Sequence, residues 1–176
     1  LDNNLSSISM GVKIDLEEEF LSYCFSGKLS EVSACLTLKA DVNTKSEDGF
    51  WSALTIAVHM NNPELLEVLL SRPQIDVNLT SSHACHRSGD IYQWTPLMFA
   101  CFWGNTDIVS RLAKVPRLNL KYGDNSGDTA AHKACEKGWR KTGDTPVMMA
   151  LKTNKTEIVK YLINLPRVQP ALALSR

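Results

Sequence analysis

A histidine and a cysteine one helical turn apart form the first candidate for catalytic chemistry in this chain. His132 and Cys135 have this spacing and Glu136 follows directly, so the group has the residue types of a nucleophile with its base. Cys135, however, occupies a small-residue position that Cys24 and Cys101 occupy elsewhere in the sequence. We therefore interpret Cys135 as a packing residue. The chain also lacks a phosphate-cradling glycine loop and a strand-turn-helix nucleophile elbow, so we predict no enzymatic activity.

The segment around residue 85 carries the residue types of a metal site. His83, Cys85 and His86 could offer three zinc ligands close together in the chain. A fourth ligand is not evident, and the spacing matches no common zinc module. We predict neither a metal nor another cofactor, and a metal-binding loop at residues 83–86 stays the less favoured alternative.

Composition restricts the class of protein and the kind of partner. The chain has 176 residues, of which 44% are hydrophobic and 22% charged, so a single globular domain is expected. Basic and acidic residues are equal in number, 19 each, which removes the electrostatic basis for binding nucleic acid or an anionic membrane. No apolar run is long enough to span a membrane, and the N-terminus lacks the pattern of a secretory signal.

The cysteines and the first residue bear on the cellular context. The five cysteines are odd in number and show no disulfide-like spacing, so free thiols in a reducing compartment are the simplest interpretation. We therefore expect an intracellular protein of the cytoplasm or nucleus. Because the chain starts at Leu1 without an initiator methionine, we expect a trimmed chain or a piece of a longer one.

Internal repetition organises most of the sequence. Four segments share one shape and begin at Ser52, Thr95, Thr129 and Thr145, and a weaker copy begins at Glu18. In each of the four, a small residue falls five positions after the start, and a glycine or asparagine falls nine positions after it. Copies this regular indicate a stacked repeat array.

Each full copy predicts two short helices. Thr95 is a helix N-cap, and Pro96 stands at the first helical position, where its missing N–H costs nothing. Leu97, Ala100 and Cys101 then form a narrow apolar stripe with small residues that allow close helix contact. A glycine ends this helix, a second helix follows, and an extended segment leads to the next copy. The repeating unit is therefore helix, turn, helix and extended loop.

These motifs resemble ankyrin repeats. The resemblance is closest in residues 124–134 (DNSGDTAAHKA), 94–101 and 39–43, and it extends from about residue 15 to residue 168. It implies an all-α, ankyrin-repeat solenoid of helix-turn-helix units joined by extended loops or short β-hairpins. It also implies that His132, the motif histidine, makes hydrogen bonds between neighbouring loops.

The resemblance divides the chain into an N-terminal extension at residues 1–14 and an ankyrin repeat domain at residues 15–176. An enlarged polar loop at residues 79–93 lengthens one copy. The chain leaves the repeat pattern near residue 169 without a polar capping helix, so we expect the array either to continue or to be covered by another element. The expected repeat copies cover residues 15–47, 48–78, 79–121, 122–140 (incomplete) and 141–170.

The fourth copy is too short for a whole repeat. Only 16 positions separate Thr129 from Thr145, and the entire second helix is missing after Gly138. Either the natural protein has lost this helix, or the sequence skips a stretch of chain. We favour the skip, because an array without the helix would expose the buried faces of both neighbours. A separation of consecutive Cα atoms far above about 3.8 Å between residues 137 and 143 would show it.

Two aromatic residues at the end of one predicted helix suggest a binding surface. Phe102 and Trp103 follow Leu97 by five and six steps of about 100°, so they point away from the apolar stripe. In proteins similar to this one, such positions and the turn residues before the motif threonine form the concave recognition surface. We expect Trp51, Trp94, Phe102 and Trp103 to be about half exposed, which would give an apolar patch of about 400 Å². The alternative is that these aromatics pack locally.

When the binding positions of ankyrin repeats are transferred to this sequence, they predict a partner-binding surface. The first half of this surface is aromatic and apolar, and the second half is charged and polar. The helices contribute Phe25, Ser26, His59, Met60, Phe102, Trp103, Glu136, Lys137, Lys152 and Thr153, and the loops contribute Phe50, Trp51, Tyr92, Trp94, Asn125, Ser126 and Asp128.

The sequence thus predicts a protein-interaction module, expected to be monomeric, that binds a partner protein or peptide. The alternative is an internal regulatory or scaffold segment that docks on a neighbouring domain of a larger protein. The resemblance also implies hydroxylation of the asparagine that closes the extended segment. Asn43 and Asn78 match this position, and Asn119 matches it partly.

Overall fold

A computed structural model describes residues 16–84 and 91–137 of the chain, and it describes the side chains as far as residue 134. These residues are mostly helical, with one two-stranded antiparallel sheet. A helix at residues 16–26 precedes the labelled elements, which are α2 (Leu29–Thr37), α3 (Ala53–His59), α4 (Pro63–Leu70), β1 (Ser81–Ala84), β2 (Ile91–Trp94), α5 (Pro96–Trp103), α6 (Thr106–Leu112) and α7 (Ala130–Lys137).

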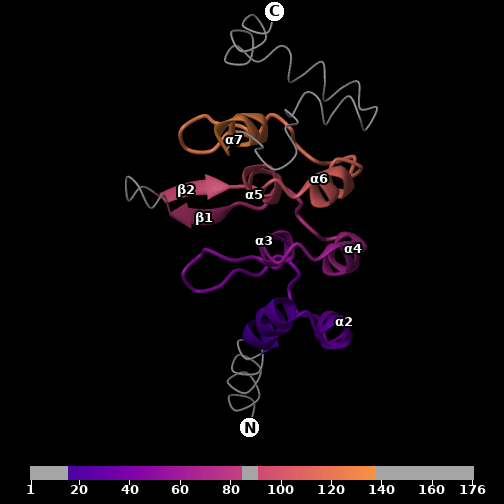
Figure 1. Cartoon of the computed structure of the whole chain (residues 1–176). Coiled ribbons are helices and arrows are strands. Elements are labelled where there is room, and N and C mark those ends of the chain that lie inside the picture. The colour runs from indigo at the N-terminus through magenta and orange to yellow at the C-terminus, as the bar shows by residue number, and fades with distance from the viewer. Residues whose placement is uncertain (1–15, 85–90, 138–176) are drawn as a thin grey trace, which may run out of the picture.

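The helices form two adjacent columns (Figure 1). In one column α3 packs against α5 and α5 against α7, and in the other α2 packs against α4 and α4 against α6. Contacts between α3 and α4, and between α5 and α6, join the columns. The loops before α3, α5 and α7 project from the side of the α3, α5 and α7 column (Figure 1). Each helix pair therefore buries its apolar side chains against the pairs before and after it.

Local sequence signals explain where the helices of the first column begin and end. Ser52 and Thr55 form a reciprocal capping box at the start of α3. Thr95 caps α5 by accepting a hydrogen bond of 3.3 Å from the N–H of Met98, and proline stands at the first helical position. Gly104 ends α5 with a φ of 74°, a left-handed conformation that glycine adopts without strain. The predicted cap and terminator of this helix are confirmed.

The core runs through both columns, and it is wider around α5 than the sequence predicts. Leu97, Ala100 and Cys101 are buried as expected. Met98 and Phe99 are buried as well, so the prediction of a narrow stripe is wrong. The reason is that α5 packs against α3, α6 and α7 and also lies next to strand β2, so that most of its surface meets other elements.

Two asparagines connect the extended loops of successive units. The side chain of Asn43 donates to the carbonyl oxygen of residue 74 at 2.9 Å and accepts from the N–H of residue 76 at 2.8 Å. Asn78 repeats both bonds with residues 117 and 119, at 3.0 and 2.8 Å. Each amide thus satisfies a backbone donor and a backbone acceptor of the next loop. We call Asn43 and Asn78 the asparagine ladder.

A shorter turn beside the ladder clarifies the position of Asn119. The side-chain oxygens of Asp41, Asp76 and Asn119 each accept a hydrogen bond from the backbone N–H two residues later, at 2.9, 2.9 and 3.0 Å. Asn119 therefore corresponds to the two aspartates. The residue at the ladder position of its loop is Lys121, so the partial match of Asn119 to the hydroxylated position is wrong.

The enlarged loop predicted at residues 79–93 is a β-hairpin over most of its described length. Strands β1 and β2 pair in antiparallel register from Ser81 opposite Trp94 to Ala84 opposite Ile91. The N–H of Ser82 donates to the carbonyl oxygen of Gly49 at 2.8 Å, which attaches the hairpin to the preceding loop. The hairpin therefore lies against its neighbour instead of standing alone.

Several predictions fall outside the described residues. They concern the extension at residues 1–14, the missing second helix with its test between residues 137 and 143, and the fifth copy at residues 141–170. None of the helices in the described part of the chain has the length and apolar character needed to cross a membrane.

Candidate aromatic binding surface

Four rings form a continuous row across three successive units. The ring centroids of Phe25 and Trp51 lie 5.2 Å apart, those of Trp51 and His59 lie 4.9 Å apart, and those of His59 and Trp103 lie 4.9 Å apart. The interplanar angles of 76°, 59° and 61° are edge-to-face or tilted, as aromatic pairs prefer. We call these four side chains the aromatic row. It links helix 16–26, the loop before α3, the end of α3 and the end of α5.

The aromatic row is open to solvent. Phe25 is 38% exposed and Trp103 is 36% exposed, His59 is also exposed, and Trp51 is half-buried. Met60, which follows His59, is 50% exposed and adds a flexible apolar side chain. The predicted exposure of Trp103 is confirmed. The row is therefore a partly exposed aromatic surface.

The position of Trp103 follows from the end of α5. The indole stacks on the ring of Phe99, one turn earlier, with centroids 5.1 Å apart and an interplanar angle of 27°. Phe99 is buried, so one side of the indole rests on the core while the other side remains exposed. His59 contacts its edge from the neighbouring unit. The contacts with Phe99 and His59 thus position the indole.

Trp94, which we expected to be half exposed, belongs to the interior, and Phe102 is partly buried and packs against it. Trp94 is only 2% exposed, and His83 stacks on it with centroids 3.8 Å apart and planes within 5°. Phe102 is half-buried against Trp94 and His83, at centroid distances of 4.9 and 5.5 Å. The expectation fails because the hairpin carries His83 over the end of α5. The alternative of local packing is correct for these two aromatics.

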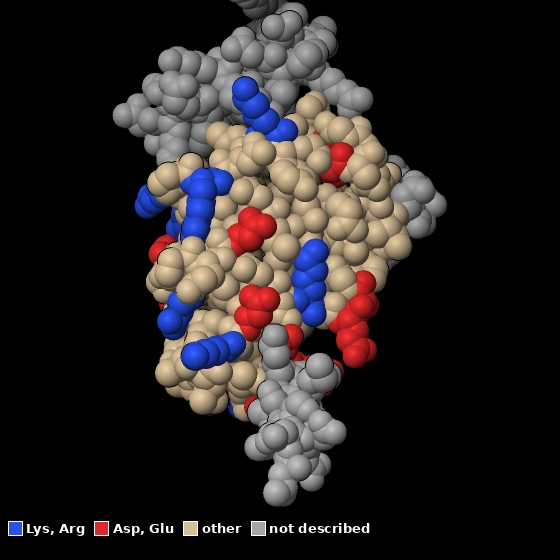
Figure 2. Space-filling view, turned by 180° about the vertical axis from the view of Figure 1, so that it is seen from behind, with Lys and Arg blue, Asp and Glu red and all other residues tan. Residues whose placement is uncertain are grey.

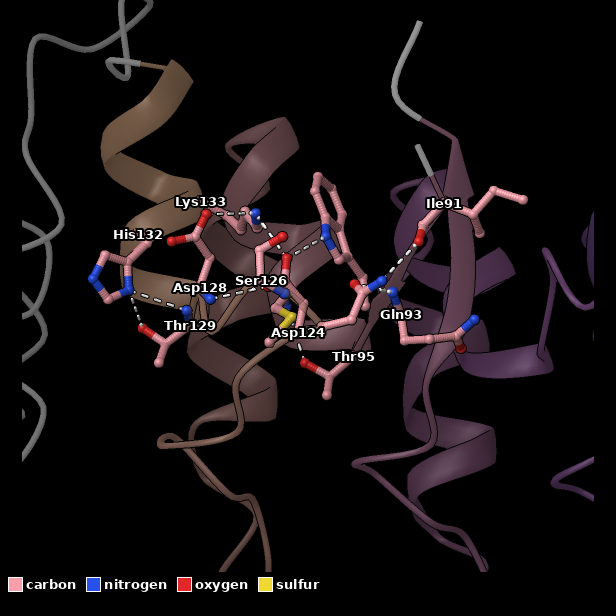
Figure 3. A network of polar contacts seen from close by, with 12 residues as sticks. Ile91, Gln93, Thr95, Asp124, Ser126, Asp128, Thr129, His132 and Lys133 are labelled. Carbon is pink, nitrogen blue, oxygen red and sulfur yellow. Dashed lines mark hydrogen bonds and ion pairs between the residues drawn. The ribbon is translucent and has the colours of Figure 1, made fainter. Parts of the chain in front are cut away.

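A network of polar contacts surrounds Asp124 and Lys133, both of which are buried (Figure 3). The Trp94 indole N–H donates to Asp124 at 3.0 Å, and the Lys133 ammonium lies 2.9 Å from Asp124 and 3.0 Å from Asp128. Lys133 is only 3% exposed, and its Nζ also lies 5.0 Å from the Trp94 ring centroid and 5.3 Å from that of Tyr92. The network joins the end of β2 to the loop before α7 and to α7 itself.

Burial and pairing act in opposite directions on the charges of this network. Burial alone would raise the pKa of the Asp124 carboxyl, but hydrogen bonds from Lys133 and from two backbone N–H groups outweigh it and lower the pKa. Burial alone would likewise lower the pKa of Lys133, but its bonds to Asp124 and Asp128 raise it. Both groups are therefore charged at neutral pH.

Comparison with protein families connects this geometry to known proteins. Models described as ankyrin repeats match residues 20–70 and 80–142, and a model of a single ankyrin repeat matches residues 142–169. The chain belongs to the ankyrin repeat family. Ankyrin repeats are generally protein–protein interaction modules, and proteins built from them are typically non-enzymatic. Among curated proteins, the comparison finds no match.

The loop before α7 attaches one ankyrin repeat to the hairpin of the preceding repeat. The side-chain amide of Asn125 donates to the carbonyl oxygen of Ile91 at 2.9 Å and accepts from the N–H of Gln93 at 3.3 Å. It therefore pairs with the outer edge of β2 as a neighbouring strand would. The N–H of Ser126 donates to Asp124, and Asp128 pairs with Lys133. These residues have structural roles, and their predicted contact with a partner stays a prediction.

Three of the remaining predicted site residues have side chains that the structure describes, and four do not. Phe50 and Tyr92 are half-buried, and the exposed hydroxyl of Ser26 donates to the carbonyl oxygen of Ser22 at 2.8 Å. Glu136 and Lys137 belong to α7, but their side chains lie outside the described part, as do Lys152 and Thr153.

The candidate nucleophile pair of the ankyrin motif is described only at its histidine. His132 Nδ1 accepts a hydrogen bond of 3.0 Å from the N–H of Thr129, within its own repeat, and the side chain of Cys135 lies outside the described part. Cys24, Cys35 and Cys101 are buried. Burial, followed by the charge of Cys35, raises the pKa of the Cys24 thiol to about 12, which disfavours the reactive thiolate.

The candidate zinc loop is likewise described only in part. Within residues 16–84 and 91–134, no three His, Cys, Asp or Glu side chains are arranged to hold a metal ion. His83 stacks on Trp94, while Cys85 and His86 lie outside the described part.

Proposed function

We propose that this ankyrin repeat chain is a non-enzymatic interaction module that binds a partner protein or peptide on a concave face. In this proposal the repeats of residues 15–176 form a solenoid, and the first helix of each repeat and the loop tips form the face. The single observation that carries the proposal is the aromatic row, because three of its four rings are exposed and the row crosses three successive units.

The physical properties of the row support a binding role. Large rings bury much apolar area for little loss of conformational freedom, and tryptophan is enriched among residues that dominate binding energy. The contacts of Trp103 with Phe99 and His59 restrict its rotation before binding, which reduces the entropy cost of association. The row is therefore the expected energetic centre of the face.

The other predicted residues surround this centre in the proposal. Met60, Phe50 and Tyr92 extend the apolar part, while Asn125, Ser126, Asp128, Glu136, Lys137 and Lys152 form a polar part. Trp94 and Phe102 support the face from beneath and do not contact the partner. We further propose that the module is a monomer in the cytoplasm or nucleus.

Quantitative affinity capture tests this proposal. The wild-type chain, Trp103→Ala and the matched control Leu38→Ala are used to capture proteins from an extract, with recovery measured by mass spectrometry. Leu38 is 68% exposed and lies at the end of α2, in the column of helices that does not carry the aromatic row. We expect proteins that the wild type and the control recover equally and that Trp103→Ala recovers at least about tenfold less. Equal recovery with all three chains would contradict the proposal.

A further inference from the structure

A second surface lies on the column of helices that does not carry the aromatic row. A hollow of about 540 Å³ opens beside α4, α6 and the loop that follows α6. Leu70, Val115 and Pro116 supply its apolar lining, and Arg111 and Lys114 are among the cations beside them. A volume of this size accommodates several side chains of a bound segment.

The cations of the hollow differ in how they are neutralised. Arg111 lies 2.8 Å from Glu67 and 2.9 Å from Asp107, so carboxylates of this chain already balance its charge. Arg117 instead donates to the backbone carbonyl oxygens of residues 73 and 72, at 2.8 and 3.4 Å. Within the described residues, no carboxylate pairs with Arg117 or with the exposed Lys114.

The balance of charge along the chain places positive charge on one side of this hollow, the side of α6 and the loop that follows it. Residues 16–78 contain ten acidic and four basic side chains, whereas residues 95–123 contain one acidic and four basic side chains. Although the whole chain has a net charge of zero, the unit around α6 therefore carries an excess of basic side chains. In Figure 2, Lys and Arg side chains gather along the left edge, the side where a half-turn from Figure 1 places α4 and α6.

We propose that this hollow docks an acidic linear segment of another protein, in which carboxylates alternate with aliphatic side chains. Carboxylates of the segment pair with Lys114 and Arg117, whose guanidinium is already held in place by the two carbonyls. Aliphatic side chains of the segment contact Leu70 and Val115. The charges are thus complementary, and the apolar lining adds buried area.

Nucleic acid fits this surface less well than an acidic peptide. A phosphate backbone needs an extended run of cations, and an apolar lining offers it nothing. Here Glu67 lines the hollow, and Glu67 and Asp107 already neutralise Arg111, so only a short run of cations remains. The proposal is independent of the aromatic row, since the hollow is formed by α4, α6 and the following loop alone.

Fluorescence anisotropy with two labelled peptides tests the proposal. The probe is a fluorescein-labelled peptide of twelve residues that alternate glutamate and leucine, and its control replaces every glutamate by lysine. We expect the intact chain to bind the acidic peptide, with an affinity that falls as salt is added, and to bind the lysine peptide at least about tenfold more weakly.

Charge reversal locates the binding site. We expect Lys114→Glu to weaken binding of the acidic peptide about fivefold or more, because it places a repelling charge in the hollow. The matched control Lys45→Glu makes the same change on the loop before α3 and should have little effect. Trp103→Ala should leave binding of the acidic peptide unchanged. The experiment therefore separates a wrong proposal about the aromatic row from a wrong proposal about the hollow.

Four results would overturn the proposal. They are absence of binding at millimolar peptide, equal binding of the two peptides, equal effects of the two charge reversals, and tighter binding of a 20-nucleotide single-stranded DNA that Lys114→Glu abolishes. Thermal unfolding of each variant controls for loss of structure.

Discussion

The indole N–H of Trp94 donates a hydrogen bond of 3.0 Å to a carboxylate oxygen of Asp124, the same oxygen that lies 2.9 Å from the ammonium of Lys133. Trp94 is the last residue of strand β2, directly before α5, whereas Asp124 and Lys133 belong to the next repeat. All three residues are buried. One carboxylate therefore fixes the position of an aromatic side chain and of a cation across the boundary between two repeats.

Trp94→Ala should destabilise the fold strongly. The substitution removes a buried indole, exposes the ring of His83 and removes a hydrogen-bond donor to Asp124. We expect a loss of about 3–5 kcal/mol in the free energy of unfolding, measured by urea denaturation. A midpoint within error of the wild type would show that the indole is not part of the core.

Lys133→Ala should also destabilise the chain, for a different reason. The variant leaves Asp124 buried without its cation, and breaking a buried pair costs about 3–5 kcal/mol. Lys121→Ala, at an exposed position, should change the free energy of unfolding by less than about 0.5 kcal/mol. Similar losses in the two variants would contradict the assignment of Lys133 as the partner of a buried carboxylate.

The same pair predicts how stability depends on pH. The pKa of Asp124 is lower in the folded state than its ordinary value of 3.8, so its stabilisation is present above that value and is lost as pH falls through the folded pKa. The pKa of Lys133 is higher than its ordinary value of 10.5, so its stabilisation is present below that value and is lost as pH rises through the folded pKa.

Urea unfolding of the wild type and Asp124→Asn from pH 2 to pH 7 measures the acidic side of this dependence. The free energy of unfolding should fall more steeply below about pH 4 in the wild type than in the variant, because only the wild type must protonate the paired carboxylate. Parallel curves would show that Asp124 does not contribute to the acid sensitivity.

Asn78→Ala should weaken the connection between two successive loops. The variant loses bonds of 3.0 and 2.8 Å to the backbone of residues 117 and 119, which together contribute about 1–3 kcal/mol. Gln74→Ala, in the same loop, removes an exposed side chain and should be nearly neutral. Urea unfolding of both variants measures the difference, and equal stabilities would exclude a structural role for the asparagine ladder.

The sequence predicts well those features that depend on neighbouring residues. Thr95 with Pro96 begins a helix and Gly104 ends it, because capping and backbone preferences act within a few positions. The repeat spacing likewise places Trp103 outside the core. These signals need no knowledge of the distant parts of the chain.

The failures at Trp94 and Phe102 involve contacts between segments that are far apart in the sequence. The sequence predicts that Trp94 and Phe102 are exposed because it does not reveal that the ring of His83 contacts both of them. His83 reaches them from a β-hairpin, and the sequence predicts that segment only as an enlarged loop. The burial of Lys133 depends on Asp124, nine residues earlier, and the ring contact of His59 with Trp103 spans two repeats. Asp128 lies five residues before Lys133 in the sequence, which is a local sign that Lys133 forms an ion pair. This spacing is also common on solvated surfaces, so it does not indicate burial.

The affinity of Trp103→Ala for a captured partner, measured by titration calorimetry beside its thermal unfolding, tests the central claim most directly. We predict a dissociation constant at least about tenfold higher than that of the wild type, with a thermal midpoint lowered by only a few degrees, because the indole is partly exposed and rests on Phe99. An unchanged dissociation constant in a folded variant would contradict the assignment of the aromatic row as the binding surface.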